Sequence, residues 1–191
     1  NDHQGYVRVI CDEMIPAVAE ENLAEFCDVF CENGYFNLED SEKILETGMK
    51  YGLAPRLHAD EFMDSGAAVL SAKVGAVSAD HLMAVSNEGI LKMAEAGVIA
   101  TLLPGTTLFL GKTKYASGRK MIDSGCDVAL ATDFNPGSCT IQSMPHIISL
   151  ANLYCGLPSD EAFKGATWNG AKAINRWKKL GAIAEGVQAF M

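Results

Sequence analysis

Short apolar runs rich in Val, Ala and Leu alternate along the chain with longer segments whose apolar residues recur at helical spacing. Gly, Asn, Ser or Pro marks each change of pattern. The runs are nearly continuous, which is typical of strands buried on both faces of a parallel sheet. The predicted strands are residues 26–31, 54–58, 76–79, 98–103 and 127–132.

Helical patterns lie between and after these strands. Asn37 is expected to cap a helix that ends at Gly52, and Ser86 to cap one that ends at Gly97. Further helices are predicted at residues 66–75, 119–124, 143–153 and 159–175.

Five successive βα units fit either an open doubly wound sheet or part of a (β/α)8 barrel. A dinucleotide-binding sheet would carry GxGxxG after its first strand, and the chain has no such run. Each predicted strand instead ends in a different chemically capable residue, as at the active-site face of a barrel. We therefore expect an α/β fold that is a partial (β/α)8 TIM-type barrel.

The strand ends supply the candidate chemistry. His58 and Glu61 lie in HADEF, His81 lies in SADHL, Pro104-Gly105-Thr106 lies in LLPGTT, and Asp133 lies in ATDFNPGS. One or more βα units separate each strand end from the next, so these side chains should meet at one mouth. Two imidazoles and a carboxylate form a mixed nitrogen and oxygen set that zinc or iron accepts.

Each histidine taken alone is more simply explained as a buried side chain satisfied by a hydrogen bond. The cluster gains weight because both histidines neighbour an acid, Asp60 or Asp80. Asp133 also ends an apolar run, where burying a carboxylate is costly unless charge or hydrogen bonds compensate it. Glu32 ends another strand, either at the mouth or exposed beside Asn33-Gly34.

The turn FNPGS has two possible uses. Backbone N–H groups of Gly137 and Ser138 could point into the mouth and hold an anion such as a substrate carboxylate. A turn that only joins strand to helix would have the same sequence, with Asn135-Pro136 at its start.

Composition excludes several classes of protein. A chain of 191 residues suits one domain, and its net charge of −9 has the wrong sign for nucleic acid. No apolar run reaches the ~18 residues of a membrane span. The six cysteines form no CxxC pair, which indicates reduced thiols and a cytoplasmic protein. Because the chain begins with Asn1 and lacks a signal-peptide pattern, we expect a piece of a longer protein.

HADEF, SADHL, LLPGT and ATDFNPGS together resemble the imidazolonepropionase family of the amidohydrolase superfamily, from about Ala24 to the C-terminus. The resemblance implies a (β/α)8 barrel beside a small β-sandwich. Residues 1–178 would then supply barrel strands four to eight, and residues 179–191 would start the return into the sandwich. The implied activity is hydrolysis of 4-imidazolone-5-propanoate to N-formimidoyl-L-glutamate in histidine catabolism, by a homodimer.

The resemblance also implies roles for single residues. His58 and Asp133 match the family's metal ligands, for one Zn²⁺ or Fe³⁺. His81 matches the histidine that supports catalysis beside the metal, and Glu61 the position that contacts the imidazolone ring. The general base remains open among Asp133, Glu61 and His81. The positions that would hold the glutamate portion of the product are Asn135, Gly137 and Ser138.

The chain departs from the family pattern in one respect. It has no His-x-His pair at the end of a first strand, and the substrate-binding Arg, Tyr and His of the family's first half are also absent. We therefore expect this chain alone to bind metal weakly and to be inactive. Two alternatives stay open: another amidohydrolase such as a nucleobase deaminase, and a non-catalytic half-barrel.

Overall fold

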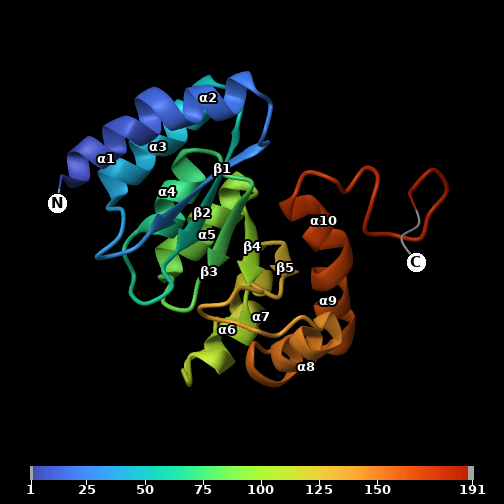
Figure 1. Cartoon of the computed structure of the whole chain (residues 1–191). Helices are drawn as coiled ribbons and strands as arrows, with labels where there is room; N and C mark the ends of the chain where they lie inside the picture. The colour runs from blue at the N-terminus through green and yellow to red at the C-terminus, as the bar shows by residue number, and fades with distance from the viewer. Residues whose placement is uncertain (1, 189–191) are drawn as a thin grey trace.

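Five parallel strands form one sheet in the order β1-β2-β3-β4-β5 in the computed structural model, which describes residues 2–188 (Figure 1). The predicted α/β alternation and the position of every strand are confirmed, although the last three strands are shorter or shifted by about two residues. The strands are β1 (Phe26–Cys31), β2 (Ala54–Ala59), β3 (Ser78–His81), β4 (Ile99–Leu102) and β5 (Val128–Leu130).

The predicted helices are present, with the expected caps. The Asn37 side chain accepts a hydrogen bond from the Asp40 N–H, and the Ser86 side chain accepts one from the Gly89 N–H. Figure 1 shows α4 and α5 behind the sheet, α3 above them at the upper left, and α8 to α10 beyond β5. The bounds are α3 (Leu38–Lys50), α4 (Ala67–Lys73), α5 (Asn87–Ala96), α7 (Gly118–Asp123), α8 (Met144–Tyr154), α9 (Ser159–Lys164) and α10 (Gly170–Ala173), with a π-helical segment at Gly165–Asn169.

A long N-terminal helix was not predicted. It consists of α1 (His3–Val9), a π-helical segment (Ile10–Met14) and α2 (Ile15–Glu20), and it lies along α3 (Figure 1). Its buried residues, Val7, Cys11 and Ile15, recur every four positions. Pro16 hides this pattern because proline disrupts a regular helix, and the wider π-helical turn just before it accommodates the proline.

A second unpredicted helix, α6 (Pro104–Phe109), begins where the sequence suggested only a strand end. Its proline occupies the first position, where the missing N–H costs no hydrogen bond. The helix places Thr106 next to the end of β5, as described below.

The two faces of the sheet differ. One face packs against the helices, and its central row is fully buried: Val29, Leu57, Ala79, Ala100 and Val128, paired in register. The opposite face carries the row Phe30, His58, Asp80, Thr101 and Ala129. Burial alternates along β1 and β2, whereas β3, β4 and β5 are buried throughout. Burial on both faces is thus confirmed for β3 to β5 and wrong for β1 and β2.

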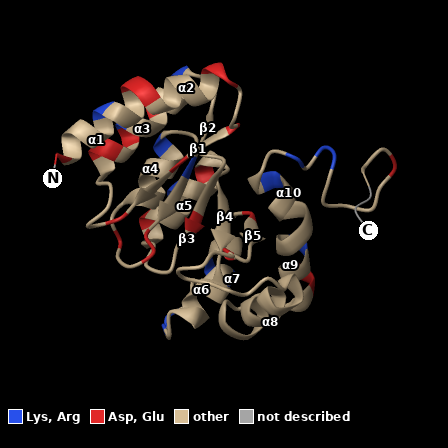
Figure 2. Cartoon of the chain, viewed as in Figure 1, with Lys and Arg blue, Asp and Glu red and all other residues tan. Residues whose placement is uncertain are grey.

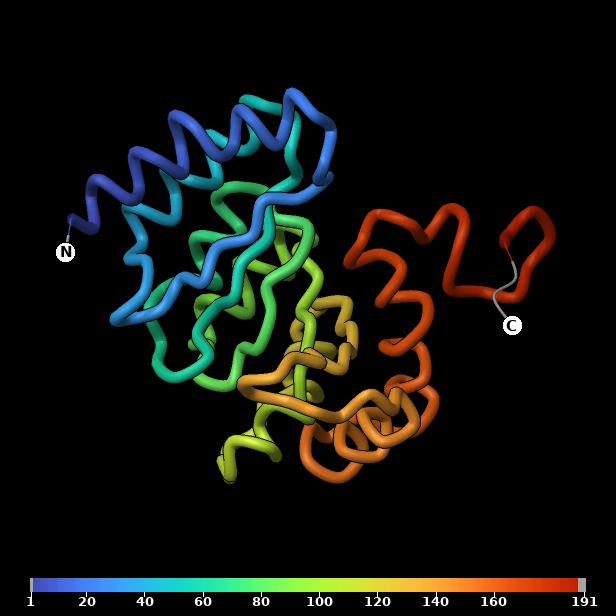
Figure 3. The backbone as a smooth tube through the Cα atoms, in the orientation of Figure 1, coloured from blue at the N-terminus to red at the C-terminus, as the bar shows by residue number. Residues whose placement is uncertain are grey.

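The C-terminal segment leaves the sheet after α10 (Figure 3). Its described part, residues 179–188, contains turns and no strand. The β-sandwich predicted for 179–191 stays a prediction, and residues 189–191 lie outside the described residues.

Acidic residues are spread over the N-terminal helices and the loops (Figure 2). Of the helices described between residues 2 and 188, none has the length and apolar character that spanning a membrane requires.

Candidate active site

The strand ends bring the predicted catalytic residues to one edge of the sheet. His58 lies near the end of β2 and His81 ends β3, and their ring centroids are 5.2 Å apart. Glu61, in the loop after β2, places its Oε2 3.7 Å from Nε2 of His81. Asp133 follows β5. Parallel strands present their carboxyl ends at the same edge, and these four side chains therefore lie near one another there.

The backbone is unusual at these positions. His81, Leu82, Asp60 and Asp133 have φ values of 76°, 62°, 50° and 52°. Residues with a side chain rarely adopt this left-handed conformation, which costs about 1–3 kcal/mol each and persists only where the surroundings enforce it. Such outliers cluster at active sites, and here they turn His81 and Asp133 at the end of their strands.

Glu32 holds the loop that carries Glu61. Its carboxylate is 1% exposed and accepts hydrogen bonds from the backbone N–H groups of Asn33 (3.0 Å) and Phe62 (2.9 Å). The alternative that Glu32 is exposed is therefore wrong. Asp60 is also buried, and it accepts bonds from the N–H groups of Ala67 and Ala68 at the start of α4. Both acids position the loop.

Asp133 is oriented by α6. The hydroxyl of Thr106 donates to Oδ2 of Asp133 at 2.5 Å, and no hydrogen bond to the other oxygen, Oδ1, is found within residues 2–188. Thr106 was among the predicted strand-end candidates, but the helix that carries it and its hydrogen bond to Asp133 were not predicted.

The charges at this edge influence one another. Burial lowers the pKa of His58, but the hydrogen bond and charge of Asp28 outweigh it, and together with the carboxylates of Asp80 and Asp133 they raise that pKa above its ordinary value. Burial raises the pKa of Glu61 to about 7. Burial, with the nearby charge of His58, lowers the pKa of His81 to about 4, which leaves its ring neutral at pH 7.

A polar cluster lies on the open face of the sheet, beneath His58. Nδ1 of His58 is 3.1 Å from Oδ1 of Asp28 on β1. Oδ2 of Asp80 accepts a bond from Arg56 at 3.0 Å, and Oδ1 accepts one from the Ser78 hydroxyl. One ligand atom from each of Asp28, His58 and Asp80 lies within 4.8 Å of the other two.

This cluster was missed at the level of sequence. Asp28 is a charged residue in the middle of FCDVFC, and Arg56 and His58 are polar residues two positions apart in APRLHA. Alternation of polar and apolar residues is typical of a strand with one open face, whereas these strands were predicted to be buried on both faces.

The turn after Asp133 is closed on itself. The N–H groups of Gly137 and Ser138 both donate to Oδ1 of Asn135, at 2.8 and 2.7 Å. Of the two uses left open for this turn, N–H groups that are free to hold an anion are therefore excluded. The Asn135 side chain competes for them locally, as Asn side chains do in turns.

A hollow at this edge is bordered by Glu61. Its lining residues are Glu61, Phe62, Met83, Ala84, Lys112, Thr113 and Lys114. No carboxylate within residues 2–188 lies within 4.0 Å of the ammonium of Lys112 or Lys114. The hollow thus joins a candidate catalytic acid to two available positive charges.

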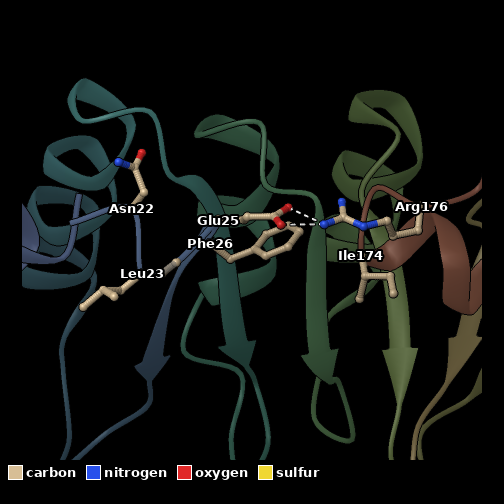
Figure 4. A pocket seen from close by; sticks show the side chains of 7 residues that line it. Asn22, Leu23, Glu25, Phe26, Ile174 and Arg176 are labelled. Atoms are coloured by element: carbon tan, nitrogen blue, oxygen red, sulfur yellow. Dashed lines mark hydrogen bonds and ion pairs between the residues drawn. The ribbon is translucent and has the colours of Figure 1, made fainter. Parts of the chain in front are cut away.

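Another hollow lies at the opposite end of the strands (Figure 4). The strand arrows point away from it, and Arg176 pairs there with both oxygens of Glu25, at 2.5 and 2.7 Å. Because barrel active sites form at the carboxyl ends of the strands, we assign this hollow no chemistry. Its ion pair joins the segment after α10 to the start of β1.

Two atoms at the candidate site are suited to a metal ion. Nε2 of His58 and Oδ1 of Asp133 have no hydrogen-bond partner within the described chain, and the partners of Nδ1 and Oδ2 orient them. Imidazole and carboxylate are ligands for zinc and iron. A catalytic site usually has three or more protein ligands, so these residues provide part of a set.

A partial barrel with histidines and an aspartate at its strand ends defines the class of this protein. The family model described as "Amidohydrolase family" matches residues 56–190, and the chain belongs to that family. The solved structure of a Xaa-Pro dipeptidase with bound methionine shares the fold, with a TM-score of 0.74 and 18% identity over 94% of this chain and 51% of that one. The predicted partial barrel is confirmed.

Curated relatives show which members of this family the chain is similar to. The imidazolonepropionase of Shouchella clausii (strain KSM-K16) is 54% identical over 98% of this chain and 42% of its own length. That of Geobacillus sp. (strain WCH70) is 55% identical over 97% of this chain and 43% of its own. The resemblance predicted from the motifs is confirmed, and the chain spans less than half the length of these relatives.

Proposed function

We propose that this chain carries part of the active site of a hydrolase that opens the cyclic amide of 4-imidazolone-5-propanoate and yields N-formimidoyl-L-glutamate, a step in histidine catabolism. The observation that carries the proposal is the 54% identity to an imidazolonepropionase over 98% of the chain. The convergence of His58, His81, Glu61 and Asp133 at one edge of the sheet agrees with it.

His58 and Asp133 would hold one Zn²⁺ or Fe³⁺, with the remaining ligands supplied from outside this chain. Such an ion, when bound, lowers the pKa of water towards ~7 and so makes a nucleophile available at neutral pH.

The side chains of this chain then handle protons and charge. Asp133 accepts a proton from the water that attacks the ring carbonyl, and passes it to the ring nitrogen as the C–N bond breaks. Thr106 keeps the carboxylate of Asp133 in place through its hydrogen bond. His81, neutral at pH 7, donates an N–H to the oxygen on which negative charge develops. Glu61, with a pKa of about 7, orients the ring and can hold or release a proton.

The propanoate side of the substrate needs its own contacts. Asn135, Gly137 and Ser138 form the turn that borders the site, and we assign them to the glutamate portion of the product. The Gly137 and Ser138 N–H groups and the Ser138 hydroxyl all contact the Asn135 side chain, so a substrate carboxylate would have to take the place of Asn135 Oδ1 in this turn. Lys112 and Lys114 add positive charge beside Glu61.

These lysines favour the imidazolone over the alternative of a nucleobase deaminase, because a neutral base has no carboxylate for them to bind. Of the other expectations, a cytoplasmic location agrees with the six free cysteines, five of them buried. The homodimer is proposed from the family resemblance alone.

The test is a chimera in which the part of the Shouchella clausii relative that this chain does not match is joined to the chain. We expect zinc- or iron-dependent loss of the imidazolone and formation of N-formimidoyl-glutamate. His58→Ala and Asp133→Asn should each lower kcat by ~10²-fold or more, with an unchanged circular dichroism spectrum. An inactive but folded, metal-loaded chimera would refute the proposal.

A further inference from the structure

The carboxylate of Asp28 has no place in the proposed reaction, although it touches one of the residues that would hold the metal. It projects from β1 onto the open face of the sheet, where it is exposed, and its Oδ1 lies 3.1 Å from Nδ1 of His58. Asp28 pairs in register with Arg56, and His58 is two residues further along β2.

This contact determines which ring nitrogen of His58 carries the proton. A carboxylate only accepts hydrogen bonds, so Nδ1 of His58 must be the donor. In the neutral ring the lone pair is then on Nε2, and Nε2 has no partner within residues 2–188. A histidine that binds a metal through one nitrogen commonly donates the other N–H to a carboxylate, which fixes both the tautomer and the orientation of the ring.

The neighbouring groups support Asp28 in this contact. Asp80 lies within the same cluster but is bonded to Arg56 and to the Ser78 hydroxyl. Arg56, whose Nη2 lies 3.0 Å from Asp80, puts positive charge next to the cluster and disfavours a cation held by Asp28, His58 and Asp80 themselves. The cluster is therefore better explained as support for His58 than as a second metal site.

We propose that Asp28 is a positioning residue that holds His58 as the Nδ1–H tautomer and directs Nε2 to the metal. The inference rests on the proposed function for the identity of the site, but it concerns a property of the metal-free chain. The positioning can therefore be measured whether or not the chain takes part in hydrolysis.

The first measurement is the tautomer of His58. Long-range ¹H–¹⁵N spectra of the chain labelled at histidine nitrogen, recorded at pH 9 without metal, distinguish Nδ1–H from Nε2–H, and a His58→Ala spectrum assigns the signals. We expect Nδ1–H in the natural chain and in Asp28→Glu, which keeps a carboxylate acceptor. Asp28→Asn, whose amide can donate to Nδ1, should show mainly Nε2–H. An Nε2–H ring in the natural chain would overturn the proposal.

The second measurement is Zn²⁺ affinity by competition with a chromophoric chelator. Asp28→Asn should weaken binding by ~10–100-fold, and Asp28→Glu should restore most of it. Asp12→Ala, which removes an exposed carboxylate of the N-terminal helix, is the control and should leave the affinity unchanged. Equal affinity in the natural chain and in Asp28→Asn would refute the positioning role.

Asp133→Asn separates this role from a second metal site. If Zn²⁺ binding survives in Asp133→Asn but disappears in Asp28→Asn, the ion sits on Asp28, His58 and Asp80, and the proposal fails. If the tautomer and affinity behave as expected while the chimera hydrolyses no imidazolone, the proposed function fails and the role of Asp28 stands.

Discussion

Lys112 and Lys114 are the residues at the edge of the site that would contact the carboxylate of the proposed substrate. Both line the hollow that Glu61 shares, and neither has a carboxylate partner within residues 2–188. An ammonium at an exposed site contributes about 1 kcal/mol to holding a carboxylate.

In the chimera, Lys112→Ala with Lys114→Ala should therefore raise KM for the imidazolone by about 5-fold if one ammonium binds the carboxylate and by about 30-fold if both do, and leave kcat nearly unchanged. Steady-state rates over a range of substrate concentrations provide the check. Lys92→Ala, which removes an exposed lysine paired with Glu95 on α5, is the matched control. An unaltered KM in the double variant would exclude the hollow from substrate binding.

Whether a site residue could be predicted from the sequence depends on whether its importance shows in its position along a strand or only in its contacts in space. His58, His81 and Asp133 were located because a polar residue that ends an apolar strand must lie at the carboxyl edge of a parallel sheet. Asp28 was not located, and Thr106 was located without its role, because the importance of both comes from the residues that they contact in space. The sequence left the use of the turn at Gly137 undecided, and the reason is local: the Asn135 side chain accepts the N–H hydrogen bonds that a ligand would need.

Among the elements, α3 is fitted closely to β1. Gly48 lies in the middle of this helix, where alanine would ordinarily stabilise by about 1 kcal/mol. A Cβ at Gly48 would, however, lie 2.7 Å from Cβ of Cys27 and 3.1 Å from its Sγ. Because of this clash, alanine at position 48 should destabilise the protein instead of stabilising it.

Gly48→Ala is therefore expected to lower the free energy of unfolding by about 1–3 kcal/mol, as overpacking does. Urea titration followed by circular dichroism measures it. Gly170→Ala, at the start of α10 where the nearest atom would be 3.4 Å away, should change stability by less. A more stable Gly48→Ala protein would show that α3 can move away from the sheet at little cost.

The N-terminal helix depends on one buried carboxylate. Asp40 on α3 is 4% exposed and accepts hydrogen bonds from His3 and Gln4 of α1, both at 2.9 Å. Burial raises the pKa of Asp40, but these hydrogen bonds outweigh it and hold the pKa below its ordinary value. The ionised form is thus favoured in the folded state.

The contribution of Asp40 to the free energy of unfolding depends on pH. Because the folded pKa of Asp40 is depressed, its contribution is complete above the ordinary value of ~3.9 and is lost as the pH falls through the folded value. Asp40→Asn should cost about 1–2 kcal/mol at pH 6 and much less near pH 3. Urea unfolding of both proteins at the two pH values tests this, and a cost that stays constant with pH would contradict it.

The N-terminal helix is an element that local sequence patterns alone do not predict. The spacing of Val7, Cys11 and Ile15 was readable, but Pro16 argues against a continuous helix in any purely local treatment. The helix forms because its buried residues pack on α3 and a π-helical turn accepts the proline, and both are consequences of the tertiary structure.

One face of the sheet is covered by helices, and the opposite face is open at β1 and β2. On the open face of β1 and β2, Asp28 is exposed and Phe30, Arg56 and His58 are partly buried, and β1 is an edge strand that pairs along its length only with β2 among the described residues. An edge strand offers unpaired backbone groups to another chain, and natural proteins usually protect it. The chain spans about 42% of the length of its Shouchella clausii relative, and the resemblance implies further strands on this side.

We therefore expect the isolated chain to self-associate through β1, with a mass by light scattering that rises with concentration. Adding the unmatched part of the Shouchella clausii relative as a separate polypeptide should suppress the association, because its strands compete for the same edge. An acidic protein of similar net charge is the control, since nonspecific electrostatic effects would act equally in both mixtures. A chain that remains monomeric at the highest concentration would mean that charge repulsion, at a net charge of −9, outweighs pairing at this edge.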